Sequence, residues 1–202
     1  MSMNQKEGIL KLVQENNGKI QTNQIVEHGL RKEALRELVT EGKLTHISRG
    51  LYMLPEASVD EYEICQLKIP KGIFSYDSAL YLHKLSNRVP QQLHMTIAYD
   101  YKVTGVREKK ANVVFHYVSP EILALGESKG KTAFGAQINT YDPERTILDV
   151  IKDRDKMDSQ IFTDALKFYF EGNNKNLLKL AKYAKAMGLS KNLSVYTEVL
   201  LK

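Results

Sequence analysis

Glycines divide the first 55 residues into short apolar segments, and this spacing restricts what the segment can fold into. Apolar residues recur at helical intervals, so we predict three helices, over residues 4–15, 22–28 and 30–41. Each is followed by a residue that tolerates the left-handed conformation of a helix end, namely Gly18, Gly29 and Gly42. Thr22 is the expected N-cap of the second helix.

The residues after Gly42 have the pattern of a β-hairpin. Two strand-like runs, residues 44–47 and 51–54, flank Ser48-Arg49-Gly50, and Pro55 closes the unit. Three short helices followed by a hairpin are typical of a winged helix-turn-helix. We predict this fold for residues 1–55.

The acidic stretch 56–63 is the predicted boundary to a second domain, residues 56–202. Asp142-Pro143-Glu144 is a strong helix start, because it supplies a capping carboxylate, a proline in the first turn and an acid at the positive end of the helix dipole. The remaining predicted elements are strands over 71–74, 93–98, 112–118 and 137–141, and helices over 75–85, 158–170, 174–186 and 190–201. The predicted fold class is therefore α+β: an N-terminal winged helix-turn-helix followed by a mixed α/β C-terminal domain that is helical from about residue 142 and ends in a helical bundle.

Composition restricts the environment of the chain. No apolar run approaches the ~20 residues of a membrane span, and the polar N-terminus lacks an apolar signal core, so a cytoplasmic location without membrane contact is expected. The single cysteine, Cys65, is interpreted as a buried, inert thiol. The net charge of +5 comes from the two ends, 1–55 and 171–202, while the middle is slightly acidic. This distribution permits binding of a polyanion at two places.

In a helix-turn-helix, the second helix of the motif enters the major groove of DNA. Because Leu35 and Leu38 would face the core, Arg31, Lys32 and Arg36 should point outward, where Arg can bind guanine and Lys can reach guanine or phosphate. Three residues of the hairpin are candidates for phosphate or minor-groove contacts: Lys43, His46 and Arg49. The alternative is an ordinary solvated face with i,i+4 charge pairing.

A second basic feature lies in the predicted helix over 174–186. Its lysines recur at intervals of four, three and three and should therefore share one face: Lys175, Lys179, Lys182 and Lys185. One interpretation is an auxiliary track for DNA phosphates, and the other is a solvated surface.

Several motifs together resemble the AbiEi-type antitoxins of bacterial AbiE abortive-infection, or type IV toxin–antitoxin, systems. They are residues 29–39, 41–44, 49–52, 74–80 and 142–149, so the resemblance extends over nearly the whole chain. The family usually has Ser or Thr near the residue before Glu144, where this chain has Asp142-Pro143.

The resemblance implies a transcriptional autorepressor that binds inverted repeats in its own promoter as double-stranded DNA. It also implies an antitoxin whose C-terminal domain counteracts a nucleotidyltransferase-like toxin, in this family without a stable complex. The DNA-binding role falls on Arg31, Lys32, Arg36 and Arg49. Inverted repeats favour two copies per operator, and the absence of an apolar seam in the sequence favours a monomer or weak dimer.

The sequence offers no recognisable catalytic residue, cofactor or metal site, so the chain is not expected to be an enzyme. Arg145 and Asp149 are i,i+4 neighbours and predict a structural salt bridge. His94 and His116 are adjacent if their strands pair, but two histidines without a third ligand make a poor metal site. Two alternatives stay open: a module whose winged helix docks a protein, and an enzyme with a deep pocket of shifted titrating groups in the C-terminal domain.

Overall fold

A computed structural model describes residues 5–48, 50–58, 60–103 and 112–200. The chain has a mixed α+β fold and divides into two compact units, Met1–Val59 and Asp60–Lys202. The division lies within the acidic stretch 56–63, four residues beyond the predicted boundary. Among the described residues, no helix combines the length and the apolar character that crossing a bilayer requires.

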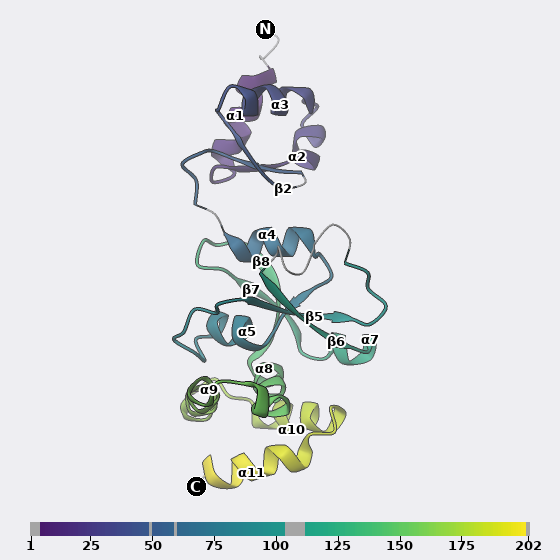
Figure 1. The fold of residues 1–202 in the computed structure, drawn as a ribbon, viewed down its shortest axis with the longest axis vertical. Helices are drawn as coiled ribbons and strands as arrows, with labels where there is room; N and C mark the ends of the chain where they lie inside the picture. Colours follow the sequence, from purple (N-terminus) through teal and green to yellow (C-terminus); the bar gives the residue numbers. More distant parts are fainter. Residues whose placement is uncertain (1–4, 49, 59, 104–111, 201–202) are drawn as a thin grey trace. The chain divides into compact units, whose positions relative to one another are not determined.

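The N-terminal unit consists of three helices and a small antiparallel sheet (Figure 1). In chain order its elements are α1 (Gln5–Glu15), β1 (Lys19–Gln21), α2 (Thr22–Glu27), α3 (Glu33–Thr40), β2 (Thr45–Ser48) and β3 (Leu51–Met53). The strand order is β1-β3-β2, and a register shift between His46 and Ser48 interrupts the β2–β3 pairing. The hairpin is present as predicted. Strand β1, which pairs Ile20 with Tyr52, was not predicted, because three residues are too few to show a period of two.

The predicted start of the third helix at Leu30 is wrong. Gly29, with φ of 69°, ends α2 in a Schellman-type turn, in which the Leu30 amide donates to the Ile25 carbonyl at 2.9 Å. The next amide, of Arg31, donates to Gln5 Oε1 at 2.9 Å. Because this turn uses the backbone of residues 30 and 31, α3 begins only at Glu33.

Thr22 is also not the N-cap of α2. The cap is Gln21, whose amide donates to Gln24 Oε1 at 2.8 Å. The Thr22 amide donates to the Gly50 carbonyl at 2.8 Å, and its hydroxyl lies 3.3 Å from the same oxygen. Thr22 therefore ties the hairpin turn to the start of α2.

The C-terminal unit is built around a five-stranded mixed sheet of order β6-β5-β4-β8-β7. Its strands are β4 (Ile73–Phe74), β5 (Leu93–Ala98), β6 (Val113–Val118), β7 (Glu127–Lys131) and β8 (Gln137–Tyr141). Its helices are α4 (Glu61–Lys68), α5 (Tyr76–Leu82), α7 (Pro120–Ala124), α8 (Pro143–Lys152), η1 (Arg154–Lys156), α9 (Ser159–Glu171), α10 (Leu177–Ala186) and α11 (Ser190–Leu200). In Figure 1, α4 lies on one side of the sheet and α5 and α8 lie on the other.

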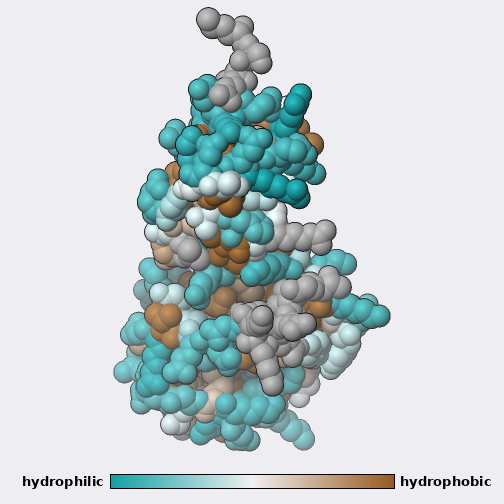
Figure 2. Space-filling view, turned by 45° about the horizontal axis from the view of Figure 1, so that its top comes forward, coloured by the Kyte–Doolittle hydropathy of each residue, from teal (hydrophilic) through white to brown (hydrophobic). Residues whose placement is uncertain are grey.

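Two apolar cores hold this unit together. One lies between α4 and the sheet and includes Cys65, Phe74 and Met95. Burial raises the pKa of the Cys65 thiol to about 12, which agrees with the expectation of a buried, inert cysteine. The other core joins α8 to α9, α10 and α11 and includes Ile147 and Phe162. On the face drawn in Figure 2, hydrophilic residues predominate and hydrophobic ones occur in small groups.

Helix α8 carries charge into the protein interior. Asp142 caps it as predicted, accepting from the Arg145 amide at 2.8 Å, and Pro143 occupies the first turn. The Arg145 side chain is buried and donates from Nε to Asp149 Oδ1 at 3.0 Å, which confirms the predicted salt bridge. Its Nη1 donates to the carbonyls of Ile122 and Leu125. Arg145 therefore joins α8 to the chain around α7.

Candidate nucleic-acid interface

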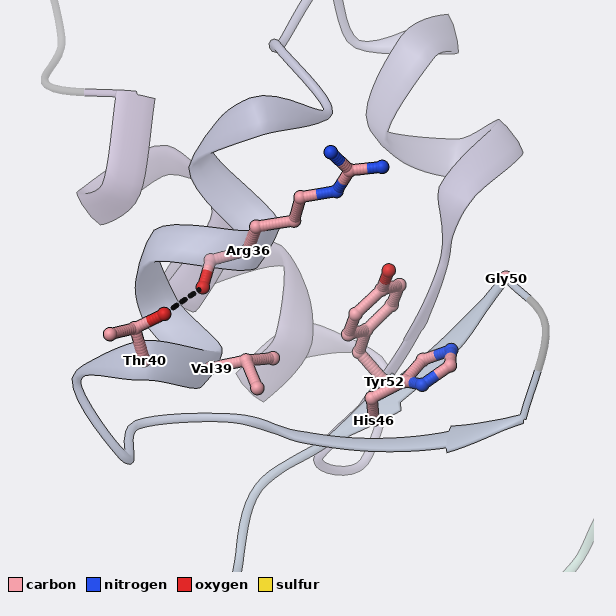
Figure 3. A pocket seen from close by; sticks show the side chains of 6 residues that line it. All are labelled: Arg36, Val39, Thr40, His46, Gly50 and Tyr52. Atoms are coloured by element: carbon pink, nitrogen blue, oxygen red, sulfur yellow. Dashed lines mark hydrogen bonds between the residues drawn. The ribbon is translucent and has the colours of Figure 1, made fainter.

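An open groove of about 600 Å³ lies between α3 and the β2–β3 hairpin. It is lined by Arg36, Val39, Thr40, His46, Gly50 and Tyr52 (Figure 3). Helix α3 positions its share of the lining because Leu35 and Leu38 are buried against α1 and the sheet, which turns Arg36 outward. The groove thus has a helical wall and a β wall, and each contributes polar side chains.

Arg36 is the cation at the centre of this groove. Figure 3 shows its side chain extending away from α3, with the Tyr52 hydroxyl pointing into the same opening. The guanidinium has no hydrogen bond or ion pair with any residue that the structure describes. Thr40, one turn further along α3, donates its hydroxyl to the Arg36 carbonyl at 3.0 Å. This hydroxyl is therefore bonded to the backbone of its own helix. No described residue therefore competes with a ligand for the side-chain donors of Arg36.

The hairpin supplies an aromatic surface opposite Arg36. The rings of His46 on β2 and Tyr52 on β3 lie 4.9 Å apart between centroids, tilted by 42°. The sequence analysis included His46 but missed Tyr52. Because Leu51 and Met53 are buried, strand alternation places Tyr52 on the opposite face of β3, and this signal was available in the sequence.

Lys32 lies on the same side of α3 as Arg36. The two residues are one helical turn apart and line a second depression together with Thr22, Glu33 and Tyr52. Lys32 is exposed. The structure therefore places Arg36 and His46 in one groove and Lys32 beside Arg36 in an adjoining depression.

Arg31 lies elsewhere. It is an exposed residue of the turn before α3 and lines a depression with Gln5, Lys6 and Glu37 on the side of α1. Arg31 and Arg36 thus do not form the single cationic ridge that the predicted helix start implied. The cause is the Schellman-type turn at Gly29, which changes the position of Arg31 relative to α3.

Lys43 is committed to an ion pair. Its Nζ lies 2.9 Å from Glu41, which also binds Lys6 of α1 at 2.5 Å, while Lys6 in turn contacts Glu37 at 2.7 Å. Glu37 and Glu41 therefore neutralise the positive charges of Lys6 and Lys43 on this side of the N-terminal unit. Arg49, the last of the predicted DNA-binding residues, lies outside the described residues.

The prediction that four lysines share one face of a helix in the C-terminal unit is wrong. Lys175 precedes α10 and donates to the Gly172 carbonyl at 3.0 Å. Lys179 lies 2.8 Å from Asp142 and 3.4 Å from Glu144, which are both largely buried at the start of α8. Only Lys182 and Lys185 of the four remain exposed without an ion pair among the described residues.

The two histidines of the C-terminal sheet are neighbours, as expected if their strands paired. His94 Nδ1 and His116 Nε2 lie 3.0 Å apart, and the rings are nearly stacked. Burial lowers the pKa of both imidazoles, that of His116 to about 4. Across residues 5–48, 50–58, 60–103 and 112–200, no cluster of three or more His, Cys, Asp or Glu side chains could hold a metal ion.

Comparison with known proteins supports the fold and leaves the function open. No family model matches the chain, and no curated protein matches it in sequence. The chain is similar in structure to the crystal structure of the Rv2827c protein from Mycobacterium tuberculosis, with a TM-score of 0.59 and 13% sequence identity. The similarity covers 96% of this chain and 79% of the other. At this identity the likeness concerns the mixed α+β fold alone.

Proposed function

We propose that the N-terminal unit is a winged helix that binds double-stranded DNA through the groove between α3 and the hairpin. In this proposal α3 enters the major groove and the β2–β3 hairpin is the wing that contacts the phosphate backbone. The observation that carries the proposal is the exposed, unpaired Arg36, with Lys32 beside it and His46 and Tyr52 opposite it.

The chemistry of this groove suits a duplex better than a protein surface. A guanidinium without a partner can donate two parallel hydrogen bonds to guanine O6 and N7, and an exposed lysine one turn away can reach a phosphate. The groove is open and holds no acidic side chain among its lining residues. The acid nearest to this surface is Glu33, which lines the adjoining depression with Lys32 and Arg36.

We further propose that the chain is a transcriptional autorepressor and antitoxin of a type IV toxin–antitoxin system. This part rests on the resemblance to AbiEi-type antitoxins of residues 29–39, 41–44, 49–52, 74–80 and 142–149. The N-terminal unit would bind inverted repeats in the promoter of its own operon in the cytoplasm, two copies per operator. The C-terminal unit would counteract a nucleotidyltransferase-like toxin.

DNA binding is tested by fluorescence anisotropy with a duplex of the chain's own upstream region and with a shuffled duplex. We expect specific binding that weakens with salt, because each neutralised phosphate contributes a slope of about 0.9 in log–log units. Arg36→Ala should reduce the preference for the upstream duplex by about 1–3 kcal/mol. Lys11→Ala, which removes a cation on α1 that faces Glu15, is the matched control and should leave the preference unchanged. Equal binding of both duplexes, or no binding, would instead support a winged helix that docks a protein.

The antitoxin role is tested separately in cells. The protein is co-expressed with a nucleotidyltransferase-like toxin encoded beside it, and growth is followed together with a promoter reporter. We expect the wild-type chain to restore growth and to repress the reporter. Arg36→Ala should restore growth but lose repression. A chain that represses without restoring growth would contradict the antitoxin role alone.

A further inference from the structure

The C-terminal unit contains a second groove that DNA binding does not use. Its volume is about 420 Å³, which is within the usual range for small-molecule sites. It lies between the start of α5, the segment before β5, and the chain from η1 to α9. The residues that the argument uses are Asp77, Arg88, Gln91, His94, Lys156 and Ile161.

Asp77 supplies a carboxylate acceptor to this groove. The residue is half-buried, and burial raises the pKa of its carboxyl group. Its carboxylate has no hydrogen bond or ion pair with a residue in the described part of the chain. A partly desolvated carboxylate without a donor is unfavourable, so a ligand that donates hydrogen bonds to it would be stabilised.

His94, next to this carboxylate, is held in place by a chain of contacts. Its Nδ1 is hydrogen-bonded to His116, whose ring stacks on Tyr76 with centroids 3.8 Å apart. The Tyr76 hydroxyl donates to Asp153 Oδ2 at 2.6 Å. These contacts leave Nε2 as the remaining polar atom of the His94 ring, which lines the groove.

The backbone is strained at Tyr76, the residue before Asp77. Tyr76 has φ of 47°, a left-handed conformation that is unfavourable for a bulky residue. Such strain persists only where the surroundings enforce it, and it concentrates at functional sites. Here it places the Tyr76 ring against His116 while the next residue, Asp77, lines the groove.

The rim of the groove carries two cations, Arg88 and Lys156, and one acid, Asp158, which also caps α9. Arg88 lies 3.5 Å from Asp158, and Lys156 lies 2.6 Å from Asp153, with side chains that are 55% and 80% exposed respectively. The Arg88–Asp158 pair is exposed on both sides and contributes little, so a phosphate can compete for Arg88, whereas Asp153, the partner of Lys156, is only 17% exposed. Val89, Pro90 and Ile161 supply apolar walls between the rim and Asp77.

We propose that this groove binds a mononucleotide whose base carries an exocyclic amino group. The base would donate to Asp77, with His94 and Gln91 beside it, and the phosphate would meet Arg88 and Lys156. The ligand needs a donor-bearing end, an apolar body and an anionic end. A free amino acid has both charged ends, but it is too small to fill about 420 Å³.

The test is titration calorimetry of the full chain with cytidine and uridine monophosphates, which have nearly the same size. Cytidine carries an amino donor at C4, whereas uridine carries a carbonyl at C4 and its donor at N3. We expect saturable binding of the cytidine nucleotide, weakened about tenfold or more in the uridine nucleotide, which has a carbonyl acceptor in place of the amino donor at C4. Cytidine and inorganic phosphate, offered separately, should each bind more weakly than the nucleotide. Inorganic phosphate binding as tightly as the nucleotide would overturn the proposal in favour of a simple anion site.

Variants locate the site. Asp77→Asn should remove the preference for cytidine over uridine monophosphate, and Arg88→Ala with Lys156→Ala should lower the affinity for both about tenfold or more. Lys182→Ala, an exposed cation on α10, is the control and should change neither. The imidazole NMR signals of His94 and His116 in the wild-type chain provide a readout that needs no substitution, and they should shift saturably with the cytidine nucleotide. The proposal fails if no mononucleotide binds, or if it binds without moving these signals.

Discussion

The two units use charge in opposite ways. In the N-terminal unit, Arg36 stands exposed in a groove and contacts no partner among the described residues. In the C-terminal unit, Arg145 is 1% exposed and is bound by Asp149 and by two backbone carbonyls. An exposed arginine costs the fold nothing and is available to a ligand, whereas a buried one holds the fold together and can bind nothing else.

The same contrast separates two rows of cations that look alike in sequence. Lys32 and Arg36 are one turn apart and both face solvent. Lys179, on the helix whose lysines recur at three to four residues, is bound by Asp142 and Glu144. Spacing along a helix predicts which side chains share a face. It does not predict which acids another helix brings to that face.

The largest expected effect is on stability and tests the structural role of Arg145. Arg145→Met leaves the Asp149 carboxylate buried without its partner, and we expect a loss of about 3–5 kcal/mol in the free energy of unfolding. Urea denaturation followed by far-UV circular dichroism measures it. Adding Asp149→Leu should recover much of the loss, because it removes the orphaned charge. Arg36→Met, the matched change at the surface, should alter stability by no more than about 0.5 kcal/mol. Equal effects at the two arginines would remove the contrast.

The second prediction concerns pH and the same buried pair. Burial raises the pKa of Asp149 from 3.8 to about 6, although Arg145 opposes the rise, and Asp149 Oδ2 has no hydrogen-bond partner among the described residues. Between these two pH values the folded chain retains a proton that the unfolded chain releases. The stability contributed by this group is therefore present at low pH and falls as pH rises through the window, by up to about 1.4 kcal/mol per pH unit.

Comparing wild type with Asp149→Asn isolates this contribution. Asp153 and Asp158 have lowered pKa values and act in the opposite direction, losing stability as pH falls, but they are common to both proteins. We expect Asp149→Asn to gain stability relative to wild type from pH 4 to pH 6 in urea denaturation. A constant difference across that range would show that Asp149 does not titrate there.

The third prediction sharpens the distinction between two arginines of the N-terminal unit. Arg36→Ala should lower the affinity for specific DNA by about 1–3 kcal/mol, because it removes a side chain that can bind a base. Arg31→Ala removes the same charge on the α1 side. It should lower the slope of log affinity against log salt concentration by no more than about one phosphate contact, and by the same amount for every DNA sequence. Anisotropy titrations at several salt concentrations distinguish the two. A larger and sequence-dependent effect at Arg31 would reverse the assignment of the groove.

The smallest expected effect separates two lysines of α10. Lys179→Ala should lower the free energy of unfolding by about 1 kcal/mol, a value reduced from that of a buried charged hydrogen bond because the lysine is partly exposed. Lys182→Ala should leave it unchanged. Thermal or urea denaturation of the two variants tests this. If neither lysine affects stability and both lower DNA affinity, the lysine row acts as the phosphate track that the spacing first suggested.

What the sequence predicted well is local. The start of α8 follows from Asp142 and Pro143 alone, because a capping side chain and a fixed φ act within one turn. The outward direction of Arg36 follows from the periodicity of Leu35 and Leu38. Strand β1 and helices α4 and α7 were missed, since each is short and depends on partners distant in the chain.

The sequence by itself thus determined the order of helices in the first 55 residues, the hairpin that follows and the face of α3 that is buried. Only the tertiary structure decided that Arg31 lies apart from Arg36, that Lys179 is neutralised by acids 35 or more residues away, and that Asp77 and His94 line one groove. The physical reason is range. Caps, turns and periodicity act over a few residues, whereas the partner of a charge is set by which distant elements pack against it.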